Sequence, residues 1–235
     1  MSEPRPLVAL IHAVPSGARI AQEAFAREFP EARLWNVLDD RLLDDALVAD
    51  GLTEPLRRRM LRLIAHVMDA GDVQGVLLTC SSYGEVVESA RSLWGTPILR
   101  SDEAMFRAAL AGPYDRIAVA ASVPPAVPAA VAQLEALVPF VRGGGRPVEI
   151  SAVLSEAAAA ADSPEATAAH LADALRAGGA DSAQAVLPAQ YSLAPAGETL
   201  AGLMGVPVLD GAGTAARELR ALLLEESSPH PATVS

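Results

Sequence analysis

The chain has 235 residues, of which 51% are hydrophobic and only 4% aromatic, and its formal net charge is −11. All 18 of its positively charged residues are arginines, which excludes enzymes that depend on a Schiff-base lysine, a pyridoxal-phosphate anchor or a P-loop lysine. Because the net charge opposes binding to a phosphate backbone, we expect no nucleic-acid partner.

A single cysteine cannot form an internal disulfide, and no charged segment followed by an apolar stretch opens the chain. No uninterrupted apolar run reaches the roughly 20 residues that a membrane helix needs. We therefore expect a cytoplasmic protein with no membrane partner. The four histidines are scattered and no glycine-rich nucleotide motif follows a strand, so neither a metal nor a cofactor is expected. A homo-oligomer is left open.

Short apolar runs alternate with amphipathic segments along the whole chain, which is typical of an α/β fold with parallel sheets. In the first half we expect strands at 7–12, 33–37, 76–79 and 97–99, and helices at 18–29 and 53–70. In the second half we expect strands at 116–121, 148–152, 185–187 and 206–209, and helices at 126–137, 164–177 and 214–224. Ser163, followed by a proline and a glutamate, is the expected N-cap of one of these helices.

The segment 76–85 has a second copy at 186–195. The same offset aligns Gln74 with Gln184, and it places Gln190 at the position of Cys80. The repeat predicts two pseudo-symmetric parallel-sheet half-domains with an active-site cleft between them. The expected boundaries are 1–101 plus 211–226 for the first half-domain, 102–210 for the second and 227–235 for a flexible tail.

Ligands of open parallel sheets bind at the carboxyl ends of the strands, so the turns after the strands are the candidate sites. Cys80 lies in such a turn, and a helix that begins near Ser82 would favour its thiolate and make it a useful acid or base. The hydroxyl and N–H groups of Ser81 and Ser82 would then bind a carboxylate or a developing enolate. The alternative interpretation is that Cys80 is a small core residue, since unpaired cysteines are among the most buried residue types.

The other candidate substrate-binding residues follow neighbouring strands. They are His12, Thr79, Ser122, Gln190, Tyr191 and Ser192. His12 is either a donor or second base or a structural histidine bonded to the backbone. The run Arg57-Arg58-Arg59 is expected to be the solvated face of a helix, and Asp39-Asp40 with Asp44-Asp45 a solvated acidic face.

The first strand ends in His12-Ala13-Val14-Pro15, a later strand ends in Thr79-Cys80-Ser81-Ser82, and the second half contains a matching turn. Together these features resemble the aspartate/glutamate/hydantoin racemase superfamily, over about residues 6–225. The resemblance implies two α/β half-domains that enclose a small carboxylate. A cysteine from each half would exchange a proton at its α-carbon without cofactor or metal. Here Gln190 stands at the second cysteine and cannot exchange a proton.

Within this superfamily the chain resembles arylmalonate decarboxylases and maleate isomerase-like enzymes. Arylmalonate decarboxylases also work with one cysteine, although theirs lies in the second half, and Ser81 and Ser82 match their hydroxyl-bearing turn. The Asp-Ser-Gly turn of the amino-acid racemases is absent, so free aspartate or glutamate is not the expected substrate.

We therefore expect a cofactor-independent isomerase or decarboxylase that acts next to a carboxylate or carbonyl of a small acid. Cys80 would be the single general acid/base, and the intermediate would resemble an enediolate. Two alternatives stay open. One is a racemase or epimerase whose second base is His12 or Tyr191, and the other is a non-catalytic protein that binds small carboxylates.

Overall fold

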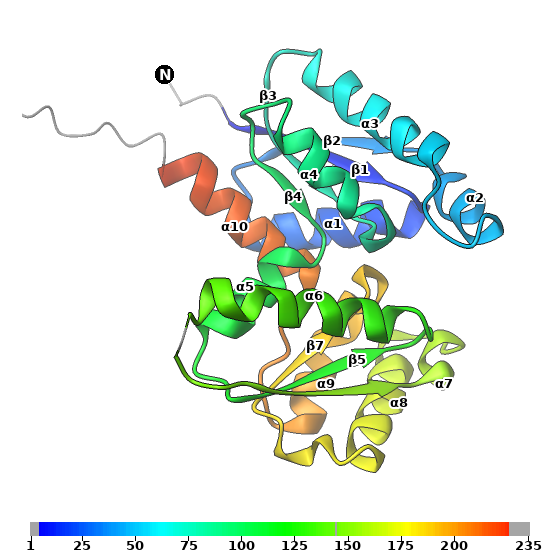
Figure 1. The fold of residues 1–235 in the computed structure, drawn as a ribbon, viewed down its shortest axis with the longest axis vertical. Coiled ribbons are helices and arrows are strands. Elements are labelled where there is room, and N and C mark those ends of the chain that lie inside the picture. Colours follow the sequence, from blue (N-terminus) through cyan, green and yellow to red (C-terminus); the bar gives the residue numbers. More distant parts are fainter. Residues whose placement is uncertain (1–4, 144, 226–235) are drawn as a thin grey trace, which may run out of the picture. The chain divides into compact units, whose positions relative to one another are not determined.

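A computed structural model describes residues 5–143 and 145–225 of the chain. The predicted tail at 227–235 lies outside the described residues. The fold divides into two compact units, each with its own parallel sheet (Figure 1). Unit 1 comprises the described residues up to Arg100 and those from Ala215 onward, and unit 2 comprises Ser101–Thr214.

Unit 1 contains a four-stranded sheet with the order β2-β1-β3-β4. Its strands are β1 (Leu7–His12), β2 (Arg33–Leu38), β3 (Val73–Leu78) and β4 (Ile98–Arg100), all parallel. Its helices are α1 (Pro15–Glu28), α2 (Leu42–Val48), α3 (Glu54–Met68) and α4 (Glu85–Arg91), and most of α10 (Gly211–Glu225) also belongs to it. Side chains on both faces of β1 and β3 are buried, because helices cover both faces of the sheet.

Unit 2 contains a three-stranded parallel sheet with the order β6-β5-β7. The strands are β5 (Arg116–Ala121), β6 (Glu149–Leu154) and β7 (Ala185–Pro188). The helices are α5 (Glu103–Ala111), α6 (Ala126–Val141), α7 (Glu156–Ala159), α8 (Pro164–Ala177) and α9 (Gly197–Met204). Separate apolar clusters lie on the two faces of this sheet, one with α8 and α9 and one with α5 and α6.

The α/β class and the two parallel sheets predicted from the sequence are confirmed. The Ser163 N-cap is also confirmed, since its hydroxyl accepts from the Ala166 N–H at 3.2 Å. The strand predicted at 206–209 is wrong, because only one bridge forms there, between Val186 and Val208. Proline at position 207 supplies no N–H to a ladder, and the chain enters α10 at Gly211.

The repeat seen in the sequence is also present in the hydrogen bonds. The Gln74 side-chain oxygen accepts from the Leu7 N–H in unit 1. The Gln184 side-chain oxygen accepts from the Asp115 and Arg116 N–H groups in unit 2. Each glutamine therefore joins the start of one strand to the start of its neighbour in the same way.

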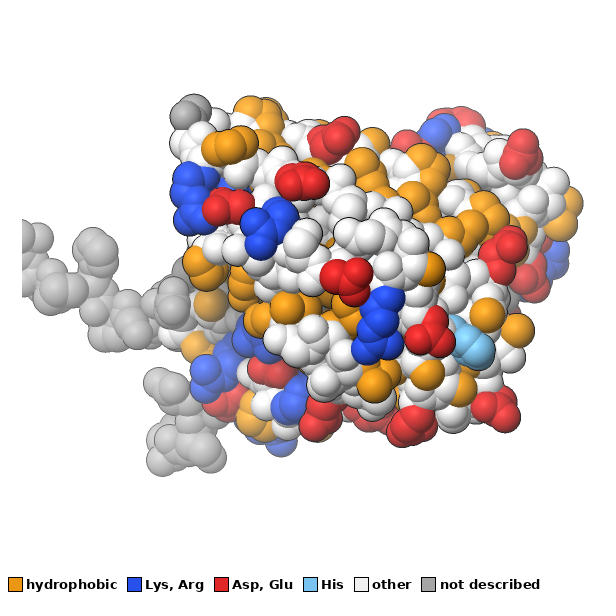
Figure 2. Space-filling model, turned by 90° about the horizontal axis from the view of Figure 1, so that it is seen from below, with side chains coloured by type: hydrophobic (Ala, Val, Ile, Leu, Met, Phe, Trp, Pro, Cys, Tyr) orange, Lys and Arg blue, Asp and Glu red, His pale blue; other side chains and the backbone are white. Residues whose placement is uncertain are grey.

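No helix among the described residues is long and apolar enough to cross a membrane. On the face shown in Figure 2, acidic, basic and apolar side chains are interspersed rather than gathered by sign.

Candidate functional site

Each sheet has one topological switch point, which is where ligands of open α/β sheets bind. In unit 1 the chain leaves β1 toward β2 on one side, and β3 lies on the other side. His12 ends β1, and Thr79 and Cys80 follow β3. In unit 2 the switch lies between β5 and β7, which are followed by Ser122 and Gln190. The residues predicted from the sequence therefore gather at the switch points of the two sheets.

Cys80 has extended backbone angles (φ −118°, ψ 113°) and precedes a 3-10 turn at Ser81–Tyr83. Its side chain is partly exposed. The expected α-helix at Ser82 is wrong, because α4 begins only at Glu85 and has seven residues. The 3-10 turn takes its place, since the N–H groups of Tyr83 and Gly84 bond to the carbonyls of Cys80 and Ser81.

Among the described residues, no backbone carbonyl accepts a hydrogen bond from the N–H groups of Ser81 and Ser82. Ser81 is half-buried and Ser82 is exposed. Backbone N–H groups left open in this way are the donors from which oxyanion sites are made. The turn thus combines a thiol with two backbone donors and two hydroxyls.

His12 and Thr79 form a buried pair below this turn. The His12 ring is fully buried, with Nδ1 2.9 Å from Thr79 Oγ1 and Nε2 2.9 Å from Asn36 Oδ1. Burial lowers the pKa of His12, and the bond to Asn36 opposes that effect, so the ring is neutral at pH 7. Its one proton then lies on Nε2 and is donated to Asn36, and the Thr79 hydroxyl donates to Nδ1.

Both side chains are committed to this network in the structure. The Ile11 carbonyl, 3.3 Å from Thr79 Oγ1, is the alternative acceptor for the single proton of that hydroxyl. A Cβ at Gly17 of α1 would lie only 2.9 Å from Thr79 Oγ1 and 3.3 Å from His12 Nδ1, so glycine lets the helix approach the pair closely. Sequence reasoning did not find Asn36 or Gly17. The only available signal was a polar residue in a strand and a glycine in a helical segment.

In unit 2, Gln190 occupies the place that Cys80 holds in unit 1. It too has extended angles (φ −133°, ψ 137°) and precedes a 3-10 segment, Tyr191–Ala196. Its side-chain oxygen accepts from the Ser122 N–H at 2.6 Å and from the Ser122 hydroxyl at 3.0 Å. Because the oxygen is bonded to Ser122, the amide NH₂ group is the part of Gln190 that is suited to binding a ligand.

Tyr191 is 8% exposed, and its hydroxyl has no hydrogen-bond partner among the described residues. Burial raises the pKa of Tyr191 above its ordinary value, and the charge of Asp210 raises it further. The phenol is therefore protonated at neutral pH, so it can donate a hydrogen bond, and its oxygen can accept one, but it cannot act as a base. Ser192, the next residue, is exposed.

The described residues contain no group of three or more His, Cys, Asp or Glu side chains that could hold a metal ion. Arg59, expected on a solvated face, instead forms ion pairs with Asp39 and Asp45 at 2.6 and 2.7 Å. Those three side chains are only partly exposed.

A family model for Asp/Glu/hydantoin racemases matches residues 19–219. The chain belongs to this family. The match begins after β1 and covers the turns that contain Cys80 and Gln190. Membership of the racemase family supports cofactor-independent racemase or isomerase chemistry. Proteins with curated functions give no match in a sequence search.

Solved structures with the same fold include glutamate racemase of Bacillus anthracis, which has a TM-score of 0.70 and 10% identity and matches over 96% of this chain and 84% of its own. Allantoin racemase of Klebsiella pneumoniae has a TM-score of 0.67 and 17% identity over 98% and 96% of the two chains. An aspartate racemase homologue of Pyrococcus horikoshii has a TM-score of 0.64 and 11% identity over 93% and 99%. At these identities the likeness shows the fold.

Proposed function

We propose that the protein is a cofactor-independent isomerase of small carboxylic acids in which Cys80 is the single general acid/base. The observation that carries the proposal is the position of Cys80. It lies at the switch point of the unit 1 sheet, partly exposed, beside the open N–H groups of Ser81 and Ser82. A thiol is suited to this role because its ordinary pKa, about 8.5, is close to working pH.

In the proposed step, the Cys80 thiolate removes a proton from the carbon next to the substrate carboxylate or carbonyl. The electron pair of the broken C–H bond moves into that group and forms an enediolate-like intermediate. The N–H and hydroxyl groups of Ser81 and Ser82 stabilise its negative charge. In a substrate with a conjugated double bond, the negative charge extends to a second carbon. The thiol returns the proton to that carbon, which regenerates the thiolate and completes the isomerisation.

In unit 2, the turn after β7 is proposed to bind carboxylate groups and to exchange no protons. Gln190 has no titratable group, and its oxygen is held by Ser122. Its NH₂ group, the Tyr191 hydroxyl and the Ser192 hydroxyl are donors suited to carboxylate oxygens. His12 and Thr79 are buried and bonded to each other, so we propose that they hold the ends of β1 and β3 beneath Cys80.

Decarboxylation is the second candidate, and the absence of a titratable group at position 190 favours it. If CO₂ leaves the substrate, the Cys80 thiol protonates the resulting carbanion from one side and is itself reprotonated from water. Malonates and keto acids therefore belong in the same substrate screen as unsaturated and hydroxy acids.

The test is turnover of such a screen by wild type, Cys80→Ser and Ser192→Ala. A serine hydroxyl is far too weakly acidic to replace a thiol, so Cys80→Ser should lose at least about 100-fold in kcat. Ser192→Ala should mainly raise KM. Full turnover by Cys80→Ser would refute the proposal. Ligand-dependent stabilisation that survives Cys80→Ser, with no turnover by wild type, would instead show a binding protein.

A gain-of-function variant tests the role of position 190. Gln190→Cys places a second thiol at the end of β7, and solvent deuterium then reports the outcome. Wild type should label one product configuration, and the variant should label both. If wild type already labels both configurations, a second acid other than cysteine is present and the chain is a racemase or epimerase.

A further inference from the structure

The Cys80 turn contains one side chain that is completely buried, Tyr83. Its hydroxyl donates to the Leu42 carbonyl at 2.7 Å, and Leu42 is the first residue of α2. The turn that follows β3 is thereby bonded to a helix 41 residues earlier in the chain. Such a bond, in a site from which water is excluded, fixes backbone position more firmly than an exposed one.

The start of α2 is itself held in place by Arg59 of α3. The Arg59 guanidinium donates to Asp39 at 2.6 Å and to Asp45 at 2.7 Å, and all three side chains are at most 34% exposed. The Asp39 N–H bonds to the His12 carbonyl at 3.1 Å. The segment between Asp39 and Asp45 therefore joins the ends of β1 and β2 to the helix layer.

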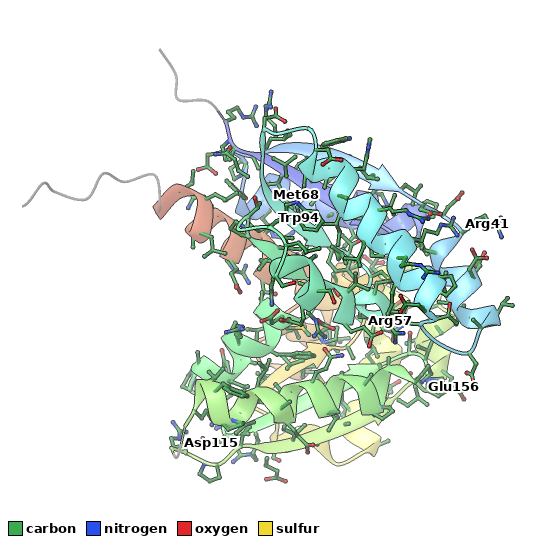
Figure 3. The ribbon with its side chains drawn as sticks, turned by 45° about the horizontal axis from the view of Figure 1, so that its top comes forward. Arg41, Arg57, Met68, Trp94, Asp115 and Glu156 are labelled. Atoms are coloured by element: carbon green, nitrogen blue, oxygen red, sulfur yellow. The ribbon has the colours of Figure 1, made fainter. Side chains whose placement is uncertain are left out.

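Two further ion pairs surround this segment but contribute less. Arg41 pairs with Asp45 at 3.1 Å and Arg57 pairs with Glu85, at the start of α4, at 2.7 Å. Figure 3 shows Arg57 and Met68 toward opposite ends of α3. Because Arg41, Arg57 and Glu85 are 74%, 42% and 55% exposed, water screens each pair and its contribution is small.

The charge of Cys80 also affects the pKa of Tyr83. Burial raises the pKa of Tyr83 to about 12, and the charge of a Cys80 thiolate is the next largest cause. Asp39 and Asp45 act in the same direction, and Arg59 opposes them. The phenol therefore stays protonated through the working range of pH and donates to Leu42 throughout it.

We propose that Tyr83 is a positioning residue for Cys80, which acts by anchoring the 3-10 turn to the start of α2. This inference rests on the proposed function, since it assigns Tyr83 to the site in which Cys80 moves the proton. Nothing in the sequence pattern separates Tyr83 from an ordinary core tyrosine. Tyr83 differs from such a tyrosine in its hydrogen bond to Leu42 and in the Arg59 ion pairs that hold the start of α2.

Tyr83→Phe removes only the anchoring oxygen, and the single cysteine of the chain makes the result readable without a substrate. The rate of Cys80 alkylation by iodoacetamide is measured against pH for wild type, Tyr83→Phe and Tyr114→Phe, a control in unit 2. The alkylation midpoint should shift in Tyr83→Phe and stay at the wild-type value in Tyr114→Phe. With a substrate, kcat should fall about 10- to 100-fold while KM changes less than about threefold, as expected when a reacting group is misplaced.

A folded Tyr83→Phe protein with the wild-type alkylation profile and kcat would overturn the inference. If that variant does not fold, Arg59→Lys takes its place, because lysine keeps the charge but cannot bridge both carboxylates. It should shift the midpoint in the same direction by less, and a wild-type profile would again overturn the inference. Full activity of Cys80→Ser refutes the proposed function instead, and the alkylation profiles still report whether Tyr83 positions the thiol.

Discussion

The two buried tyrosines of the switch-point turns should respond in opposite directions to the same substitution. Tyr83 is fully buried and its hydroxyl is bonded to Leu42 at 2.7 Å. Tyr191 is 8% exposed and its hydroxyl has no partner among the described residues. Replacing each by phenylalanine removes one oxygen and leaves the rest of the ring in place.

The expected magnitudes follow from these surroundings. Tyr83→Phe loses a hydrogen bond and leaves the Leu42 carbonyl with one partner fewer, so the free energy of unfolding should fall by about 1–3 kcal/mol. Tyr191→Phe relieves the cost of burying an unbonded hydroxyl, which is about 1–3 kcal/mol in proteins, and the free energy of unfolding should rise. If Tyr191 donates to the substrate as proposed, kcat/KM should fall in this more stable variant.

Urea unfolding followed by circular dichroism measures both changes, and far-ultraviolet spectra of the folded proteins control for altered structure. A loss of stability in Tyr191→Phe comparable with that in Tyr83→Phe would refute the reasoning, because it would mean that the Tyr191 hydroxyl is already bonded in the free protein. A gain in stability with unchanged kcat/KM would refute only its proposed contact with substrate.

Two other predictions concern the backbone of unit 2 and the pH dependence of unit 1. Gly211→Ala places a Cβ 2.1 Å from the Ser101 carbonyl oxygen and should destabilise the fold by several kcal/mol or prevent folding. Gly202→Ala, in α9 with open space around it, should instead stabilise the fold by up to about 1 kcal/mol. Equal urea midpoints for the two variants would contradict this prediction. The pKa of His12 is lowered by folding, so its contribution to stability is complete above about pH 6.5 and declines as the pH falls, because the unfolded chain takes up the proton first. His12→Gln should reduce the fall in unfolding free energy between pH 7 and pH 5.5. If that fall is the same as in wild type, His12 is not the group that causes it.

The sequence predicted the strands that pass through the centre of each sheet, because apolar runs such as that of β3 are continuous where both faces are covered. It also aligned Gln190 with Cys80, and both residues have extended backbone angles and precede a 3-10 segment. The 3-10 turn after Cys80 was not predicted, because a 3-10 turn and an α-helix can begin with the same hydroxyl-rich sequence.

The Arg59 network was missed for a geometric reason. Successive helical residues point about 100° apart, so a run of three arginines cannot share one face. Arg58 is exposed, but Arg59 lies beside the buried face formed by Leu56 and Met60 and so reaches Asp39 and Asp45. Partners that lie 14 and 20 residues away in other elements leave no local pattern from which the pairing could be predicted.

The most direct test of the central claim is proton exchange at the substrate carbon. Small carboxylic acids are incubated in deuterium oxide with wild type or Cys80→Ser, and loss of the α-proton signal is followed by NMR. We expect exchange by wild type on at least one acid and a loss of at least about 100-fold in Cys80→Ser. Exchange by Cys80→Ser at the wild-type rate would show that another group moves the proton and would contradict the role proposed for Cys80.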